Sequence, residues 1–441
     1  MSPHLSLSIA DAEIAPVKEH KGKKNHASKL GSALGRLPHS GRSRSAGHGE
    51  AALNSAIARL SSSPQDGFRS GVEGGYTAWV REVLRAVAAE PRAAVLFDST
   101  IKEPTELLAA VVRRAFAGGV TDRYESTFAG GNRFVAAAVA DRHGVHPDQV
   151  ICTTGATSAM GMAMRAFVAA GDHVIVEAPA FDLLPALAQD ARARVTPLPR
   201  RAPDFAIDLD ELAALVRPDT RLILLTQVHN PSGAILDVQT LQAIGEIAAR
   251  SGAKVLIDEV YADFADVGSA VRISDVFISA GSLTKVQGLF ALKCGWAVGS
   301  RANIAAIQAA NPQGDLGVSK LTHAIGALVL EDMAPFEAHW RGVLDAARPV
   351  LADHARRMVV DGLILGDLPT FGCMYFPRVV GVSDSLSLAS WLWSSEQIVV
   401  APGEFFGQPG HIRIGFGGDA AALDAGLARL HRALLRLRAA A

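Results

Sequence analysis

The sequence predicts an α/β protein with a mainly parallel sheet, and two observations support this prediction. Short apolar segments typical of buried strands, such as 221–226 and 254–257, alternate with segments that have helical spacing. Three polar residues, Asn230, Asp258 and Lys285, follow consecutive strands at nearly even intervals of 28 and 27 residues. Each interval fits one strand plus a crossover of a dozen or more residues, and crossovers of one hand make the strands parallel.

The composition is that of an ordinary globular protein and argues against several kinds of partner. Of the 441 residues, 49% are hydrophobic and 20% are charged, and the formal net charge is −1. No strong attraction to nucleic acid or to an anionic membrane is therefore expected. No apolar run approaches the roughly 18 residues of a membrane span, and the N-terminus lacks the apolar core of a secretory signal.

The cysteine pattern favours a reducing compartment. The three cysteines, Cys152, Cys294 and Cys373, have neither metal-ligand spacing nor the pattern of a disulfide framework. We therefore expect a cytoplasmic protein without a metal site.

The first 50 or so residues are polar, basic and rich in serine and glycine. Such a segment buries too little apolar surface to offset the entropy lost on ordering, so we expect a flexible tail rather than a basic arm for an acidic partner or a targeting segment. Along the chain we predict a flexible N-terminal extension (1–70), an N-terminal arm that contributes to a small domain (71–120), a large domain (121–310), an interdomain helical region (311–350) and a small C-terminal domain (351–441).

The individual elements follow from hydrophobic spacing and from turn residues. Apolar residues recur at three- and four-residue intervals between Trp79 and Val87, which predicts a helix that stops before Pro91. After an extended segment at 95–104, further helices are predicted over 105–116, 133–143, 154–169, 240–250, 303–350 and 420–440. Strands are predicted over 149–153, 174–176, 194–198, 221–226, 254–257, 276–278, 374–376, 398–400 and 411–414.

One lysine, Lys285, stands in the turn that follows the strand at 276–278, among small and hydroxyl residues. A lysine that is rigidly held and partly dry has a lowered pKa, which frees its amine for attack on a carbonyl. A single lysine after a strand is usually just a surface residue. However, the carboxyl ends of parallel strands share one edge of a sheet, so Asn230 and Asp258 should converge with Lys285. Together these groups are typical of pyridoxal phosphate (PLP) chemistry.

A glycine turn after the strand at 149–153 is the candidate phosphate site. Residues 154–158, Thr-Gly-Ala-Thr-Ser, open a helix, and a helix N-terminus offers free backbone N–H groups and a positive dipole end to an anion. The glycine spacing matches neither a Walker loop nor a dinucleotide-binding fingerprint, which argues against a nicotinamide enzyme.

Four stretches together resemble the class I/II aminotransferase family of fold-type I PLP enzymes, over roughly residues 95–441. They are Asn230-Pro231-Ser232-Gly233, Asp258-Glu259-Val260-Tyr261, the lysine turn at 282–289 with Gly295-Trp296, and Arg413-Ile414-Gly415-Phe416. The resemblance implies a large PLP-binding domain with a mainly parallel sheet of the seven-stranded type, a smaller α/β domain, and a homodimer with shared active sites.

The resemblance also implies roles for individual residues. Lys285 would bind PLP as an internal aldimine and shuttle the α-proton of the substrate. Asp258 would keep the pyridine nitrogen protonated, the alternative being a helix-capping aspartate. Asn230 and Tyr261 would bind the phenolic oxygen of PLP, unless they are a turn residue and a core tyrosine. Arg413 would bind the substrate α-carboxylate, together with Asn230, the alternative being an ion pair within the small domain.

Further residues would complete the cofactor site. Phe181 would stack on the pyridine ring, although a core phenylalanine is an equal alternative. Tyr124 would reach the phosphate of the neighbouring subunit. The phosphate cup would consist of Gly155, Ala156, Thr157 and Ser282.

Two positions depart from the pattern of the family. Lys293, eight residues after Lys285, replaces an arginine that usually binds the phosphate; lysine keeps the charge but loses the planar fork. Lys102, in Lys102-Glu103-Pro104, replaces a glycine close to the substrate carboxylate, so its side chain would alter substrate binding or the course of the reaction.

The function that follows is an aminotransferase of amino acid metabolism, which moves an amino group between an L-amino acid and a 2-oxo acid. The alternative within PLP chemistry is a lyase, decarboxylase, racemase or cyclase of a specialised biosynthetic pathway, since the same electron sink serves all of these. A non-catalytic PLP sensor fused to a DNA-binding domain would require a compact helix-turn-helix and a basic patch, which residues 1–70 do not supply.

Overall fold

The computed structural model describes residues 53–57, 75–125, 131–265, 267–313 and 317–440. Most of the predicted N-terminal extension and most of the loop between Tyr124 and Gly131 lie outside these residues. The domain boundaries at 120, 310 and 350 stay predictions. No helix of the described residues is long and apolar enough to span a membrane.

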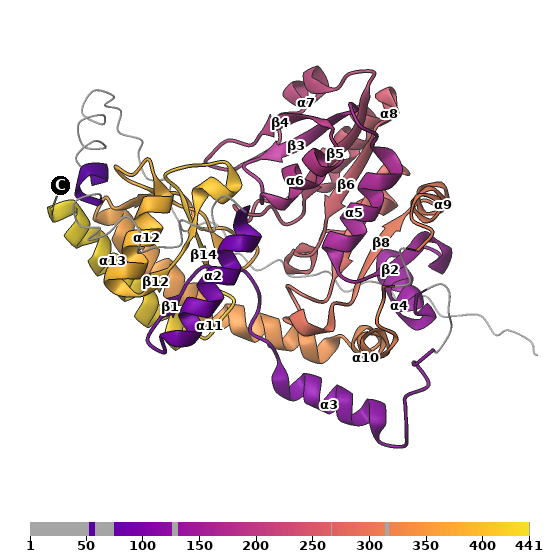
Figure 1. Ribbon diagram of the computed structural model, residues 1–441, viewed down its shortest axis with the longest axis horizontal. Coiled ribbons are helices and arrows are strands. Elements are labelled where there is room, and N and C mark those ends of the chain that lie inside the picture. Colours follow the sequence, from indigo (N-terminus) through magenta and orange to yellow (C-terminus); the bar gives the residue numbers. More distant parts are fainter. Residues whose placement is uncertain (1–52, 58–74, 126–130, 266, 314–316, 441) are drawn as a thin grey trace, which may run out of the picture. The chain divides into compact units, whose positions relative to one another are not determined.

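The three strands that precede Asn230, Asp258 and Lys285 belong to one seven-stranded sheet (Figure 1). Its strands are β2 (Val150–Thr153), β3 (His173–Ala178), β4 (Arg194–Pro199), β5 (Thr220–Thr226), β6 (Lys254–Asp258), β7 (Phe277–Ser282) and β8 (Gly295–Gly299). They lie in the order β2-β8-β7-β6-β5-β3-β4, and β8 runs in the direction opposite to the other six strands. The α/β fold with a mainly parallel sheet is therefore confirmed.

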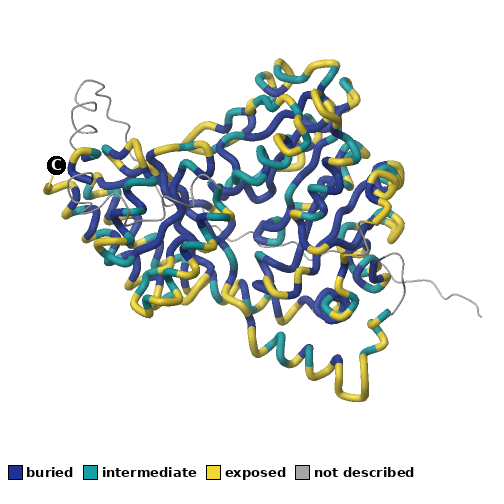
Figure 2. The backbone as a smooth tube through the Cα atoms, in the orientation of Figure 1, coloured by how far each residue is buried: buried dark blue, intermediate teal, exposed yellow. Residues whose placement is uncertain are grey.

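Helices cover both faces of the sheet because successive side chains of a strand point to opposite faces. In β5, Leu222 and Leu224 pack in one apolar cluster with α5 (Ala156–Phe167) and α6 (Leu183–Asp190). Ile223 and Leu225 pack in another, with α7 (Leu209–Leu215) and α8 (Val238–Ser251). The four central residues of the strand, Leu222–Leu225, are consequently all apolar and all buried, in line with the dark blue centre of the sheet (Figure 2).

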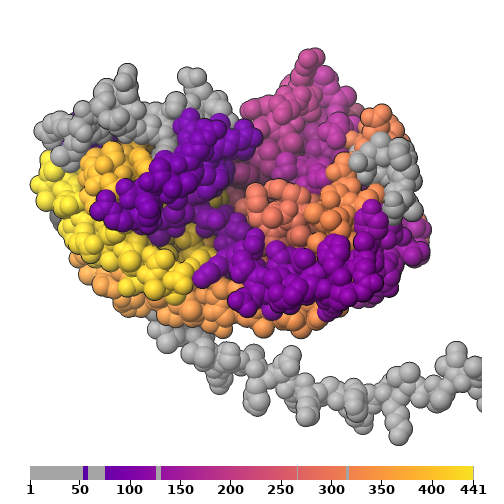
Figure 3. All heavy atoms as spheres, turned by 60° about the horizontal axis from the view of Figure 1, so that its bottom comes forward, coloured from indigo at the N-terminus to yellow at the C-terminus, as the bar shows by residue number. Residues whose placement is uncertain are grey.

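The C-terminal part is built from short strands. An antiparallel sheet joins β10 (Met374–Tyr375), β14 (Ile412–Gly415) and β13 (Ala401–Pro402), while β9 (Ile364–Leu365) pairs with β11 (Arg378–Val379). In addition, β1 (Ala94–Val95) pairs in parallel with β12 (Ile398–Val399), so an N-terminal segment packs on C-terminal residues. Figure 3 shows the indigo and purple N-terminal segment crossing the surface beside the yellow C-terminal atoms.

The remaining helices are α2 (Gly75–Ala89), α3 (Thr105–Phe116), α4 (Arg133–His143), α9 (Arg301–Ala310), α10 (Lys320–Leu330), α11 (Ala334–Val360), α12 (Ser385–Glu396) and α13 (Ala420–Ala439). The helical stretch predicted over 303–350 is thus three helices. The strand predicted over 276–278 continues to Ser282, because it pairs with β8, a short glycine-bounded strand that hydrophobic spacing did not reveal.

Candidate active site

The ends of three parallel strands bring the predicted residues to one edge of the sheet. Thr226, the last residue of β5, is in register with Asp258, the last residue of β6, and Asp258 is in register with Ala280 of β7. The backbone N–H of Asn230 donates to Thr226 Oγ1 over 3.1 Å, which fixes the loop after β5 at the same edge. Crossovers of one hand explain this arrangement.

Asp258 lies at the centre of this edge. Its Oδ1 accepts a hydrogen bond from the backbone N–H of Val260 over 3.1 Å. Burial raises the pKa of the Asp258 carboxyl to about 7, against the opposing effects of the Val260 hydrogen bond and of the positive charge of Lys285. A group that brings a positive charge next to this carboxyl would restore its ionised form.

Lys285 is half-buried, and an extended segment holds it in place. Its Nζ donates to Thr100 Oγ1 over 3.3 Å, and its carbonyl accepts from the backbone N–H of Ile101 over 3.0 Å. The segment of Thr100 lies against β14 so closely that a Cβ at Gly415 would be 1.6 Å from the Asp98 carbonyl oxygen. The glycine of the Arg-Ile-Gly-Phe stretch is therefore required for this contact.

Tyr261 is buried beside the same segment, and its hydroxyl forms a 2.8 Å hydrogen bond with Ser99 Oγ. Burial raises the pKa of the Tyr261 hydroxyl, so the group keeps its proton at neutral pH. A protonated phenol is available to donate a hydrogen bond to a phenolate or carboxylate oxygen.

Arg413, in β14, is buried and points its guanidinium toward the sheet edge. Nη1 donates to Asn230 Oδ1 over 2.9 Å, and Nη2 donates to Tyr76 Oη over 2.8 Å and to the Phe97 carbonyl over 3.0 Å. Nε is buried without a hydrogen-bond partner among the described residues. All three acceptors are neutral oxygens, so these hydrogen bonds are not the ion pair within the small domain that was the alternative for Arg413. A buried cation whose partners are neutral can bind an anionic ligand.

The candidate phosphate cup forms at the start of α5. Gly155 caps this helix at φ +102° without a side-chain cap, so no described residue occupies the first backbone N–H groups of α5, which can bind an anion. Ser282 and Gly295 pair across β7 and β8, and a Cβ at Gly295 would be 2.4 Å from the Cα of Gly155. Ala156 and Thr157 form the first turn of the same helix.

The geometry is that of a family that can be named. A model of the family "Aminotransferase class I and II" matches residues 92–430. The chain belongs to this family. It is 32% identical over 316 residues to a capreomycidine synthase of Streptomyces vinaceus, covering 69% of this chain and 79% of the relative. It is 30% identical over 320 residues to a probable N-succinyldiaminopimelate aminotransferase of Mycobacterium tuberculosis, covering 69% and 80%.

Solved structures support the fold of this aminotransferase family member. An aspartate aminotransferase of Thermus thermophilus, crystallised with maleate, has a TM-score of 0.74 at 19% identity and covers 82% of this chain and 98% of its own. A PLP-dependent cyclase, OrfR, has a TM-score of 0.70 at 24% identity and covers 80% and 96%. Both show the fold-type I architecture predicted from the four sequence stretches.

PLP is the cofactor of the family, and the residues of this member fit it. A lysine amine, a carboxyl that an adjacent positive charge would ionise, and a helix start with free N–H groups meet at one sheet edge. The close Gly155–Gly295 packing leaves the turn without a side chain that would fill the space of a phosphate.

Two further predicted residues of this aminotransferase family member, Phe181 and Lys293, each contact an aromatic ring. Phe181 is half-buried, with its ring centroid 5.0 Å from that of Tyr76 in an edge-on contact. Lys293, at φ +49°, has Nζ 3.5 Å from the ring centroid of Phe290; its partial burial and then the charge of Lys285 lower its pKa. The charge of Lys285 thus acts on Lys293, and Lys293 stays a candidate phosphate ligand.

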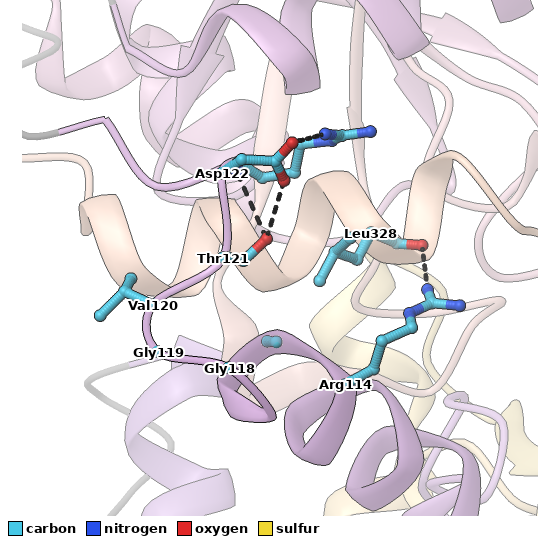
Figure 4. Close-up of a pocket in the computed structure, with 9 residues that line it drawn as sticks. Arg114, Gly118, Gly119, Val120, Thr121, Asp122 and Leu328 are labelled. Atoms are coloured by element: carbon cyan, nitrogen blue, oxygen red, sulfur yellow. Dashed lines mark hydrogen bonds and ion pairs between the residues drawn. The ribbon is translucent and has the colours of Figure 1, made fainter.

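Two predicted residues are not brought into the cluster. Lys102 Nζ lies 3.7 Å from an Asp419 carboxylate oxygen at the surface. The Lys102 ammonium group therefore pairs with this carboxylate. Tyr124 is 39% exposed. It comes directly after the residues of a surface pocket, which is lined by Arg114, Ala115, residues 118–123 and Leu328, and in which Arg114 Nη2 donates to the Leu328 carbonyl (Figure 4). No residue predicted for the cofactor site lines that pocket. The exposure of Tyr124 leaves it available to a second subunit.

Sequence reasoning missed Tyr76, Ser99 and Thr100, which contact the predicted residues directly. Thr100 and Ser99 lie in the extended segment before Lys102 and belong to no motif. Tyr76 precedes Trp79 by three residues, a helical spacing that indicates a shared helix face but not a contact with Arg413.

The buried ion pair between Glu177 and Arg200 stabilises the loop of Asn230 through Thr226. Glu177 accepts hydrogen bonds from Thr226 Oγ1 over 2.5 Å and from Arg200 Nη1 over 2.7 Å, and both charged side chains are inaccessible to solvent. Burial raises the pKa of the Glu177 carboxyl, while Arg200 opposes this shift. Thr226 in turn holds the backbone of Asn230.

We expect Arg200→Ala to lower the free energy of unfolding by about 3–5 kcal/mol, because the change leaves the Glu177 charge buried without its partner. Urea denaturation of the purified protein measures this. Arg201→Ala is the matched control, since Arg201 pairs with Glu211 at the surface and its loss should have little effect. Equal effects of the two substitutions would contradict the structural role of the buried pair.

Proposed function

We propose that this enzyme transfers the amino group of an L-amino acid to a 2-oxo acid, with Lys285 as the covalent anchor of PLP and as the proton carrier. The observation that carries the proposal is the convergence of Lys285, Asp258 and the buried Arg413–Asn230 pair at one sheet edge. An amine, an acid and a carboxylate receptor at one point are what the reaction of an α-amino acid requires.

Each residue has a defined task in this proposal. When bound, PLP supplies a carbonyl that accepts the amino group and a ring that withdraws electrons from the α-carbon. Arg413 binds the α-carboxylate and orients the substrate, because its guanidinium is held by Asn230 and has donors to spare. The Lys285 amine would take the α-proton from the α-carbon and deliver it to the former carbonyl carbon of the cofactor, on the other side of the amino nitrogen. Asp258 would hold the protonated ring nitrogen, because a positive charge beside the carboxyl would keep it ionised.

The further assignments are part of the same proposal. Tyr261 and Asn230 bind the phenolic oxygen, and Phe181 covers the ring. Tyr124 acts across the interface of a homodimer, which its exposure supports. We also infer a cytoplasmic location. The phosphate is bound by Gly155, Ala156, Thr157, Ser282 and Lys293.

A second candidate function is cyclisation or another reaction without net amino transfer. Two similar proteins are named a capreomycidine synthase and a PLP-dependent cyclase rather than aminotransferases. The lysines at 102 and 293 also depart from the pattern of the aminotransferases. The same residues would serve this chemistry, because Lys285 and Asp258 act on the α-carbon before the reactions diverge.

One experiment distinguishes the two functions. The purified enzyme with PLP is mixed with each of the twenty L-amino acids, and the visible absorption of the cofactor is followed with and without 2-oxoglutarate. Amino transfer predicts that an amino acid removes the cofactor band and that the oxo acid restores it, with formation of glutamate. Turnover that is independent of any oxo acid would favour the second function. No change with any of the amino acids would contradict both functions for these substrates.

A further inference from the structure

The helix α2 lies before the part of the chain that matches the family, yet its first turn reaches the candidate site. The backbone N–H of Tyr76 donates to Asp182 Oδ2 over 2.6 Å, and Asp182 follows Phe181 in the loop after β3. The backbone N–H of Asp182 in turn donates to the Phe405 carbonyl over 3.1 Å. The start of α2 is therefore fixed to the loop after β3, which Phe405 holds in turn, and Tyr76 has a defined position.

The Tyr76 side chain lies among aromatic rings and against Arg413. Its ring centroid is 5.0 Å from that of Phe181 and 5.6 Å from that of Phe405, edge-on in both cases. The Arg413 guanidinium carbon lies 5.4 Å from the Tyr76 ring centroid and 4.9 Å from that of Phe406. Tyr76 thus stands between the predicted ring-covering residue and the predicted carboxylate receptor.

The donors of Arg413 show what a carboxylate would meet. A guanidinium has five N–H groups. Two pairs of them point in parallel and can bind both oxygens of a carboxylate: the Nε–H with one N–H of Nη2, and one N–H of Nη1 with the other N–H of Nη2. Both N–H groups of Nη2 are engaged, with Tyr76 Oη and with the Phe97 carbonyl. Within the described part of the chain, the donors left without a partner are the Nε–H and one N–H of Nη1, which do not form a parallel pair. In this arrangement Arg413 alone cannot bind both carboxylate oxygens.

We propose that the Tyr76 hydroxyl is the second half of the substrate carboxylate site: it accepts from Arg413 and donates its own proton to the carboxylate oxygen that the arginine does not hold. This inference rests on the proposed function, because it assumes that Arg413 meets the α-carboxylate. Tyr76 is then a substrate-binding residue contributed by a helix outside the family match.

The chemistry of the hydroxyl suits this task. Its hydrogen bond from Arg413 uses an oxygen lone pair and leaves the O–H free, and no second partner of this hydroxyl is found among the described residues. Burial raises the pKa of the Tyr76 hydroxyl, against the charges of Arg413 and Lys285, so the proton stays in place. A donor polarised by a cation forms a stronger hydrogen bond to an anion than a neutral donor does.

The test is Tyr76→Phe in the enzyme loaded with PLP, since phenylalanine keeps the ring and its aromatic contacts. The probes are the L-amino acid that reacts fastest in the screen described above, the amine with the same side chain but no carboxylate, and acetate as a competing inhibitor. Tyr375→Phe is the matched control, because it removes a buried hydroxyl that binds the Gly366 carbonyl instead. Arg413→Lys tests the receptor itself, and the melting temperature of each variant checks folding.

We expect Tyr76→Phe to raise the KM for the amino acid and the inhibition constant for acetate by about tenfold or more, as for the loss of a hydrogen bond to a charged group. The rate with the amine, kcat and the melting temperature should change by little. An equal loss with amino acid and amine, or an unchanged or lower KM, would overturn the role of Tyr76. If Arg413→Lys also leaves the preference for the carboxylate unchanged, the assignment of Arg413 in the proposed function fails as well.

Discussion

Lys285→Ala is expected to lower kcat by at least about 10³-fold, because the lysine has two tasks that no neighbour replaces. It anchors the cofactor, and its amine carries the α-proton. The hydroxyl to which Lys285 donates, Thr100 Oγ1, lies 3.3 Å from Nζ but is far too weak a base at neutral pH to take over. Steady-state rates with the best amino acid, together with the visible spectrum of the enzyme with PLP, measure both losses.

Lys254→Ala is the control for this substitution. Lys254 begins β6 at the opposite end of the strand from Asp258, so its removal takes away one lysine without touching the site. Wild-type activity in this variant and a strong loss in Lys285→Ala are the expected pair of results. Comparable activity in both variants would exclude Lys285 from the reaction.

Asp258→Asn is expected to have opposite effects on catalysis and on stability. Loss of the negative charge leaves nothing to hold the ring nitrogen protonated, so kcat should fall by about 10²-fold or more. In the protein without PLP, however, burial raises the pKa of this carboxyl from about 3.8 to about 7. The asparagine keeps the oxygen that accepts from the Val260 N–H but carries no charge to desolvate.

The sign of the stability effect follows from proton linkage. Between about pH 4 and pH 7 the folded protein holds a proton on Asp258 that the unfolded chain has released, so this carboxyl costs stability increasingly as the pH rises. Above pH 7 the accumulated cost is on the order of 4 kcal/mol, the product of about three pH units and 1.36 kcal/mol. Asp258→Asn without PLP should therefore be more stable than the wild type at pH 8 and similar to it at pH 4.

Urea denaturation of both proteins without PLP, at pH 5 and pH 8, tests this linkage. The difference in the free energy of unfolding between variant and wild type should grow with pH. A difference that is independent of pH would show that the Asp258 carboxyl is already ionised in the folded protein. PLP should remove the effect, because the positive charge of the ring nitrogen compensates the carboxylate.

The sequence contains enough information to predict the sheet and its edge. Apolar runs such as Leu222–Leu225 are buried on both faces, and polar residues follow where each run ends. Parallel connection then forces Asn230, Asp258 and Lys285 together, whatever the side chains do elsewhere. By contrast, β8 escaped prediction because its five residues acquire their strand conformation from pairing with β2 and β7 rather than from spacing.

The contacts of the arginine could not be predicted in the same way. Tyr76 and Arg413 are 337 residues apart, and their hydrogen bond depends on how α2 packs on the loop after β3. No local pattern encodes such a contact. The same holds for Lys102, whose expected place near the substrate was inferred from the family pattern, whereas its charge lies beside Asp419. Long-range packing, not propensity, decides both.

The most direct test of the account is to identify the lysine that carries PLP. The enzyme with PLP is reduced with borohydride, which fixes the cofactor covalently to its lysine, and the digested protein is analysed by mass spectrometry. We predict one modified lysine, Lys285, and no modification when an excess of the reacting amino acid is present during reduction. A label on Lys293 or on another lysine, or no label at all, would contradict the assignment of this sheet edge as the active site.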